Sequence, residues 1–122
     1  SLADAAALIR FLFTNELVYE TDSLVQKKMG ADGTLRALER ALAVLTEAEP
    51  FEAAVLEAAL RSLAEELKLN PGQLFGSLRI ATTGQRISPP LFESMEVLGR
   101  GRTLTLVEDA VGKLKGVGAE ST

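Results

Sequence analysis

The 122-residue chain contains neither cysteine nor histidine, and these two absences exclude whole classes of function. Without cysteine there is no disulfide, no thiol redox chemistry and no thiolate nucleophile. Without histidine the chain lacks the general base of a Ser-His-Asp hydrolase. Zinc sites built on nitrogen or sulfur ligands are excluded as well. The lack of cysteine suits the cytoplasm, where we expect the protein to act.

Aromatic residues are scarce, at 5 %, although hydrophobic residues make up 47 % of the chain. An aliphatic core is therefore expected, and the many leucine and alanine residues favour helices. No apolar run reaches the roughly 18 to 20 residues that a membrane helix needs, so no membrane partner is expected. A signal peptide is not apparent either. The chain does not begin with Met, and we interpret it as a fragment of a longer protein.

Positive charge is in deficit, with 13 Lys and Arg against 17 Asp and Glu. The net charge of −4 has the wrong sign for a simple nucleic-acid binder, and DNA is not an expected partner. Residues 1–70 hold seven basic and twelve acidic side chains, whereas residues 71–118 hold six basic and four acidic. Most of these charges are expected to solvate helix faces. The more specific interpretation is that a polyanion binds only to residues 71–118.

Strand patterns are missing, because period-two alternation never lasts and β-branched residues are sparse. Helical periodicity is frequent instead, interrupted by glycine and by Asn-Pro and Ser-Pro pairs that start helices. We predict an all-α fold, a small irregular bundle of six or seven short helices with no sheet. The expected helices are 3–13, 22–29, one capped by Asp32, one from Pro50 to about Leu69, 71–83, 89–98 and 103–115.

One helical domain is expected over residues 1–115. The helix within residues 1–14 is predicted to lie at the boundary with an upstream domain. Residues 116–122 are predicted to form a flexible tail. No helix is long enough for a coiled coil, and we expect a monomer.

Candidate catalytic groups are few. Glu65 and Glu66 are adjacent on a helix, so they point in different directions and cannot act as a close pair. Glu93 and Glu96 share a helix face, but nothing cationic accompanies them, and no metal site is expected. The segment 72–76 has two glycines but lacks the Lys and Ser/Thr of a phosphate-binding loop. We therefore expect no catalytic site in this chain.

The most informative stretch covers residues 78–92, where a helix ends, a polar loop follows and a new helix opens at Ser88. A helix start offers free N–H groups that attract phosphate or base acceptors. Arg79 and Arg86 flank the loop and can bond base edges or stack on exposed bases. A corner with two solvated arginines would have the same sequence, so both interpretations stay open. The apolar residues that follow form a candidate ledge for an unstacked base: Pro89, Pro90, Leu91 and Phe92.

Four blocks in this half follow one another at fixed spacing: Gly-Gln-Leu-Phe-Gly-Ser-Leu-Arg at 72–79, Thr-Gly at 83–84, Ser-Pro-Pro-Leu-Phe-Glu at 88–93 and Leu-Gly at 98–99. Their order and spacing resemble the C-terminal signature of bacterial glutamyl-tRNA synthetases. Residues 8–13 resemble the helix near the start of that family's last domain. The resemblance spans nearly the whole chain, strongly over 72–99 and weakly over 14–70.

This resemblance implies an all-helical, non-catalytic anticodon-binding region of a class I synthetase. In the family, a separate Rossmann domain uses ATP and Mg²⁺ to attach glutamate to tRNA, and its nucleotide signatures are missing from this chain. No cofactor is thus expected in the chain itself. The implied partner is the anticodon loop of a glutamate-accepting tRNA.

The resemblance also implies roles for the residues of the corner. By position, Arg79 is expected to reach an anticodon base. Ser88, Pro89 and Leu91 are expected to line the pocket for a neighbouring base, with Phe92 supporting it.

Two positions depart from the family pattern. Ser77 stands where the family often has Pro, and we expect this to be harmless on a helix surface. The segment 99–102, Gly-Arg-Gly-Arg, has an extra glycine where an acidic residue is expected, which predicts a looser last helix.

A competing hypothesis is a helical protein–protein interaction or regulatory domain with no RNA role. The acid-rich first part and the shortage of aromatic platforms support it. A basic-rimmed pocket with Arg79 and Ser88 would favour RNA, and an exposed apolar groove would favour a protein partner.

Overall fold

The computed structural model describes residues 17–87 and 89–120, with side chains as far as Gly116. Within these ranges there is no strand, which agrees with the predicted all-α fold. The predicted number of six or seven helices is wrong for this part of the chain, and the expected helix 3–13 lies outside it. The elements are a 3-10 turn, η1 (Thr21–Leu24), and the helices α2 (Gly30–Glu47), α3 (Ala53–Glu66), α4 (Pro71–Thr83) and α5 (Leu91–Glu120).

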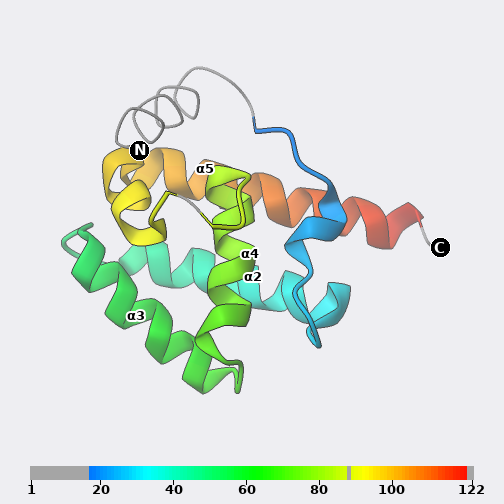
Figure 1. Ribbon diagram of the computed structural model, residues 1–122, viewed down its shortest axis with the longest axis horizontal. Coiled ribbons are helices and arrows are strands. Elements are labelled where there is room, and N and C mark those ends of the chain that lie inside the picture. Colours follow the sequence, from blue (N-terminus) through cyan, green and yellow to red (C-terminus); the bar gives the residue numbers. More distant parts are fainter. Residues whose placement is uncertain (1–16, 88, 121–122) are drawn as a thin grey trace.

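Helices α2 and α5 lie side by side and run in opposite directions, and α4 crosses them (Figure 1). Two contacts fix this antiparallel arrangement. Lys115 Nζ lies 3.7 Å from Glu39 Oε2, and Arg100 Nη1 donates to the carbonyl of Leu45 over 2.8 Å. Helix α3 packs against α2, α4 and α5 and completes the bundle.

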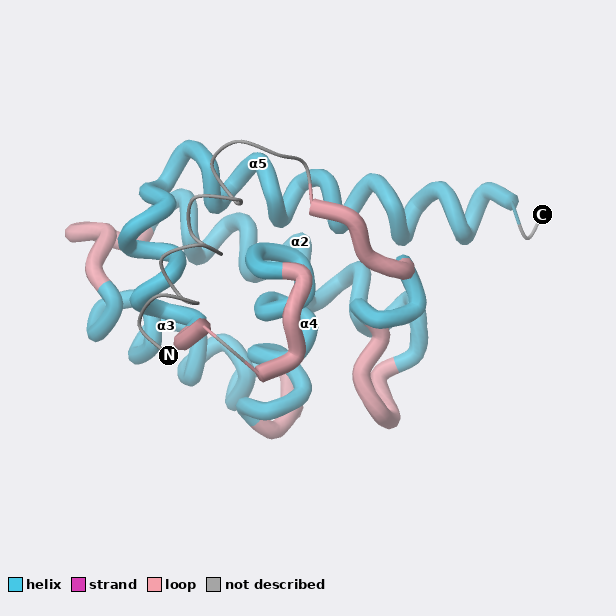
Figure 2. The backbone as a smooth tube through the Cα atoms, turned by 45° about the horizontal axis from the view of Figure 1, so that its top comes forward, coloured by secondary structure: helices cyan, strands magenta, loops and turns pink. Residues whose placement is uncertain are grey.

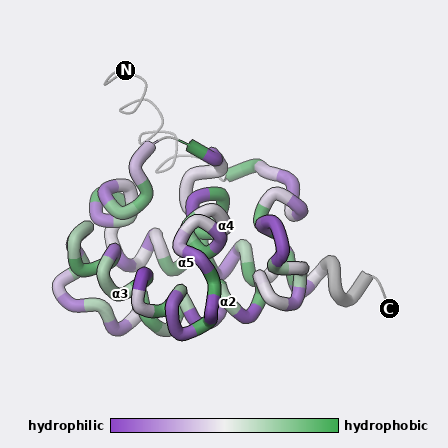
Figure 3. The backbone as a smooth tube through the Cα atoms, turned by 60° about the horizontal axis from the view of Figure 1, so that its bottom comes forward, coloured by the Kyte–Doolittle hydropathy of each residue, from purple (hydrophilic) through white to green (hydrophobic). Residues whose placement is uncertain are grey.

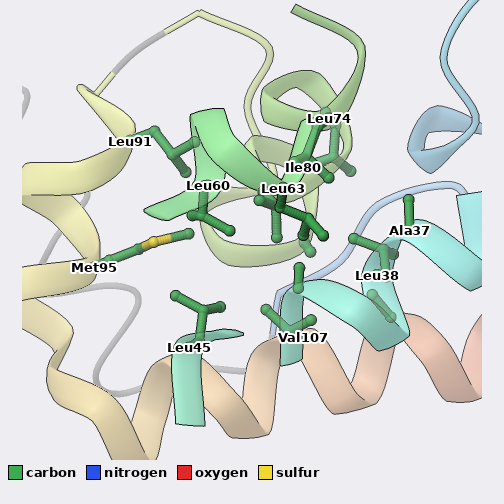
Figure 4. Packing of buried hydrophobic residues seen from close by; sticks show 14 of the residues in the cluster. Ala37, Leu38, Leu45, Leu60, Leu63, Leu74, Ile80, Leu91, Met95 and Val107 are labelled. Atoms are coloured by element: carbon green, nitrogen blue, oxygen red, sulfur yellow. The ribbon is translucent and has the colours of Figure 1, made fainter. Parts of the chain in front are cut away.

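Leucine forms most of the core, as the composition predicts. Along each helix, hydrophobic and hydrophilic residues alternate in short stretches (Figure 3), which gives every helix one apolar face. These faces meet between α2, α3, α4 and α5 (Figure 4). Fully buried side chains include Leu38, Leu45, Leu60, Leu74, Met95 and Val107.

Local sequence defines α4 at both ends. The Asn70 side chain accepts a hydrogen bond from the Gln73 backbone N–H over 2.9 Å, and the Gln73 side chain accepts one from the Asn70 N–H over 3.0 Å. This reciprocal pair is a capping box, with Pro71 at the first helical position. Gly84 ends the helix in a left-handed conformation at φ 70°. The predicted helix 71–83 is confirmed.

Two helix starts differ from the prediction. Helix α2 begins at Gly30, so Asp32 lies in the first turn rather than at the N-cap. The predicted helix 22–29 shrinks to η1, because the backbone is already extended at Val25, and left-handed backbone at Lys28 turns the chain again before α2. Helix α3 begins at Ala53 rather than Pro50. The backbone N–H of Ala53 donates a hydrogen bond over 2.6 Å to Oε1 of Glu96 in α5, a residue that is distant in the sequence.

The two predicted helices 89–98 and 103–115 form one element, α5, with a kink at Gly99. Gly99 has φ 84° and ψ 166°, so the helix break predicted at this glycine is present. Helical backbone resumes at Arg100 and continues to Glu120, beyond the predicted end at Lys115.

The expectation that Ser77 lies on a helix surface is wrong. Its side chain is fully buried, and its hydroxyl donates to the carbonyl of Leu24 over 2.5 Å. A proline has no group that replaces this donor. In this chain Ser77 therefore ties η1 to α4.

Candidate nucleic-acid interface

Figure 2 shows the loop between α4 and α5, and side chains of α4 hold this loop in place. Arg79 Nη1 donates to the carbonyl of Ile87 over 3.1 Å and to that of Pro89 over 2.9 Å. Thr83 Oγ1 accepts the backbone N–H of Gln85 over 3.1 Å. These bonds fix both ends of a segment that has no regular secondary structure of its own.

Apolar side chains support this loop from the core. Pro89 is buried, and Leu91 and Phe92 are only 2 % and 8 % exposed. The rings of Phe75 and Phe92 meet edge to face, with centroids 5.0 Å apart and planes at 86°. The side chains of Leu91 and Phe92 thus offer a ligand little surface of their own, and they support the loop rather than forming an exposed ledge. The position of Ser88 lies outside the described residues.

The tip of the loop faces solvent. Gln85 and Arg86 are exposed, and the Ile87 side chain is 85 % exposed. A hollow of about 410 Å³ lies beside the tip. Among the described residues, its wall carries one cationic side chain and no carboxylate, although the whole chain has a net charge of −4. The residues lining it are Ser23, Ile80, Gly84, Gln85, Arg86 and Ile87.

A larger hollow, of about 550 Å³, lies between residues 17–19 and α5. Its wall includes Glu108 and Asp109 together with Arg102 and Lys113, so its charge is mixed. The pKa of Tyr19 there is raised to about 12, first by burial and then by the charge of Asp109. Carboxylates disfavour a polyanion, so the smaller hollow at the loop is the better candidate for nucleic acid.

Comparison with known proteins identifies the family of this chain. The family model described as "Anticodon binding domain" matches residues 1–111. The chain belongs to this family. Three relatives, each named glutamate–tRNA ligase, are similar to it over nearly its whole length. The protein of Roseiflexus castenholzii is 44 % identical over 98 % of this chain, that of Dehalococcoides mccartyi 45 % over 93 %, and that of Mycobacteroides abscessus 42 % over 98 %.

This anticodon-binding domain spans about a quarter of the length of those relatives, with 24 %, 23 % and 24 % of each covered. The predicted resemblance to glutamyl-tRNA synthetases is therefore confirmed, and the chain is homologous to one part of such a ligase.

Sequence reasoning named candidate residues at this corner but not Ser23, Gln85 and Ile87, which line the hollow. Arg79, Pro89, Leu91 and Phe92 are brought together at the loop, and Arg86 lines the hollow beside it. Ser23 was missed because it reaches the hollow from η1, far away in the sequence. The sequence could have indicated Ile87 as a candidate, because it is a large apolar residue inside an otherwise polar loop.

The described surface as a whole carries few large apolar side chains. Val18, Ile87 and Val97 are the exposed large hydrophobic residues there, and they come from three different segments. In the part of the chain that the structure describes, no group of three or more His, Cys, Asp and Glu is arranged to hold a metal ion. None of the helices in that part is long and apolar enough to cross a membrane.

Proposed function

We propose that this domain contacts the anticodon loop of a glutamate-accepting tRNA through the α4–α5 corner. One observation supports this site above all: Arg79 holds the loop in shape while Gln85, Arg86 and Ile87 remain exposed at its tip. Sequence-specific RNA readers usually bind unpaired loop bases, because the grooves of A-form RNA hide base edges. An anticodon loop presents such bases.

Each residue of the corner has a distinct role in this proposal. Arg79 uses Nη1 to hold the loop and offers its other guanidinium N–H groups to a base. Arg86 supplies a cation that stacks on a base or meets a phosphate. Pro89 and Leu91 lie beneath the loop and support the backbone that, together with Ser88, forms the pocket for a neighbouring base. Phe92 supports this pocket through its contact with Phe75.

Catalysis belongs, in this proposal, to the remaining part of a glutamate–tRNA ligase. That part uses ATP and Mg²⁺ to attach glutamate to tRNA in the cytoplasm. The chain described here acts as the C-terminal domain over residues 1–115 and as a monomer. Its net charge of −4 predicts weak binding to RNA in general, because few lysines and arginines neutralise phosphates.

A binding titration tests the proposal. A fluorescent stem-loop with the anticodon of glutamate tRNA is titrated with the chain at low salt, beside a stem-loop with a scrambled anticodon. We expect binding that depends on the anticodon. Arg79→Ala and Arg86→Ala should each weaken it by about 1–3 kcal/mol, the range of a good arginine–base contact. Arg86→Ala is the cleaner variant, because Arg79 also holds the loop.

Arg36→Ala is the matched control, since it removes one exposed arginine from α2 and changes the net charge equally. A loss with Arg36→Ala as large as that with Arg86→Ala would mean that only total charge matters and would refute the site. Binding that ignores the anticodon would refute the proposed function and favour the alternative of a protein–protein interaction domain.

A further inference from the structure

We infer that the hollow beside the loop tip binds one unstacked nucleotide, with Ile87 as its apolar platform and Gln85 as the group that bonds its base edge. The inference rests on the proposed function and extends it. It adds Ser23, Gln85 and Ile87 to the residues expected to touch RNA. None of these three belongs to the contacts implied by the family signature.

The two hydrogen bonds that Arg79 Nη1 donates to the loop, which we call the Arg79 clamp, explain why Ile87 is exposed. Arg79 Nη1 binds the carbonyl of Ile87, so the backbone at this residue is fastened toward α4. The side chain is left 85 % exposed, whereas Val18 and Val97 are the other exposed large hydrophobic residues in the described part of the chain. Exposing an isoleucine costs folding free energy relative to burying it. A loop built to hold it outward is well suited to an apolar face of a ligand.

The wall of the hollow matches the chemistry of a nucleobase. Ile80 and Ile87 are apolar, as the flat face of a base requires. The Gln85 amide carries both a donor and an acceptor and can pair with a base edge. Arg86 adds a positive charge near the sugar-phosphate chain. None of the described residues that line the hollow is a carboxylate that would oppose a phosphate.

Both walls of the hollow are anchored to the same helix. On one side, Arg79 of α4 holds the loop that carries Gln85 and Ile87. On the other, Ser77 of α4 bonds the carbonyl of Leu24, next to Ser23 in η1. The hollow is therefore a defined feature of the fold, although its two walls are distant in the sequence.

An abasic scan combined with point variants tests this subsite. The ligands are the glutamate anticodon stem-loop and a series in which one loop nucleotide at a time lacks its base. They are titrated with the unaltered chain, Ile87→Ala and Gln85→Ala. The unaltered chain should bind one of the abasic stem-loops more weakly than the intact stem-loop, because that ligand lacks the base that Ile87 and Gln85 contact. Ile87→Ala should lower affinity for the intact loop about four- to fifteenfold, as expected for losing contacts worth about one or two buried methyl or methylene groups.

The decisive result concerns whether the effect of Ile87→Ala depends on the presence of that one base. Ile87→Ala should bind the intact loop and that one abasic loop almost equally, while keeping its sensitivity to the other positions. Val97→Ala is the matched control, because it shortens another exposed β-branched side chain. It should bind every ligand as the unaltered chain does. Thermal unfolding of Ile87→Ala should be unchanged, because this side chain packs against little.

Three results would overturn the inference. Affinity of Ile87→Ala equal to that of the unaltered chain would do so, and so would equal losses for Ile87→Ala and Val97→Ala. A variant that weakens binding but stays sensitive to every abasic position would likewise exclude a single-base subsite. In each case anticodon-dependent binding by the unaltered chain would leave the proposed function standing. If the unaltered chain ignores the anticodon, the proposed function fails, and this subsite with it.

Discussion

Two arginines of this domain make the same kind of contact in two different regions. Arg79 Nη1 donates to two backbone carbonyls of the α4–α5 loop. Arg100 Nη1 also donates to two carbonyls, those of Leu45 and Thr46 at the end of α2, over 2.8 and 3.0 Å. Arg100 is anchored further, by an ion pair with Glu49 at 3.0 Å and by the ring of Phe51 at 5.0 Å.

The difference lies in what each arginine holds. The last carbonyls of a helix lack partners within the helix, and a cation there also meets the negative end of the helix dipole. Arg100 therefore stabilises the packing of α2 against α5, a contact that the fold itself needs. Arg79 holds a segment without regular structure, whose tip faces solvent. The Arg100 region thus maintains the fold, and the Arg79 region maintains the shape of a surface.

Arg100→Ala should have the largest effect on stability. It removes two charge-assisted hydrogen bonds, an ion pair and a cation–π contact, so we expect a loss of about 2–3 kcal/mol in the free energy of unfolding. Urea denaturation measures it. At a temperature where the variant is folded, its RNA affinity should stay unchanged. A stability loss below that of Arg79→Ala would contradict the comparison.

Gly99→Ala should come next, because Gly99 sits at the kink just before Arg100. An alanine at φ 84° is strained, and beyond its chain neighbours and its own helix backbone no described atom lies within 4 Å of its added Cβ, so the expected cost of about 1–3 kcal/mol is backbone strain alone. Gly101→Ala is the matched control, with the same open space but helical backbone. It should stabilise the protein by about 0.5–1 kcal/mol. Melting temperatures of the two variants should therefore move in opposite directions.

Arg79→Ala should change global stability by about 1 kcal/mol or less, because its two bonds hold only a surface loop. Its effect should appear locally, as faster hydrogen exchange at the amides of Gln85, Arg86 and Ile87. Amides in the middle of α2 serve as the internal reference. Faster exchange throughout the molecule would show that Arg79 maintains the fold in the way that Arg100 does.

Tyr19 offers the smallest and most local test, because it is the only tyrosine of the chain. Its hydroxyl is buried and has no hydrogen-bond partner among the residues that the structure describes. Burial and, to a smaller extent, the charge of Asp109 raise the pKa of Tyr19 from 10.0 to about 12. The folded state thus holds this proton more tightly than the unfolded state, and the associated stability is lost as pH rises from 10 through 12.

Near-ultraviolet absorbance of the phenolate should show a titration midpoint near pH 12. Asp109→Asn should lower the midpoint, since it removes the charge of Asp109. Arg79→Ala should leave it unchanged if the loop loosens without disturbing residues 17–24. A midpoint at the ordinary value of 10 would mean that Tyr19 is not packed as described.

Sequence reasoning worked where the signal is local. The Asn70-Pro71 start and the Gly84 end of α4 depend on residues that are neighbours in the chain. It failed where the partner is distant. The start of α3 at Ala53 depends on Glu96, and the burial of Ser77 depends on the carbonyl of Leu24.

The same division holds for the candidate site. Arg79 and Arg86 could be named as candidates from the sequence because two arginines flank a polar loop. Sequence could not show that Nη1 of Arg79 is already bonded to the loop, since this depends on how the backbone folds back toward α4. The contribution of Ser23 depends on the packing of η1, for which the sequence holds no local signal.

The clamp made by Arg79 has a further consequence, for the entropy and the kinetics of recognition. A flexible loop loses conformational freedom when it binds, and fixing one backbone residue costs roughly 1–2 kcal/mol. Here the protein meets most of that cost during folding, so a ligand finds a preorganised surface. Loosening the clamp should then slow productive association as well as speed dissociation, because part of the population would no longer hold the binding shape.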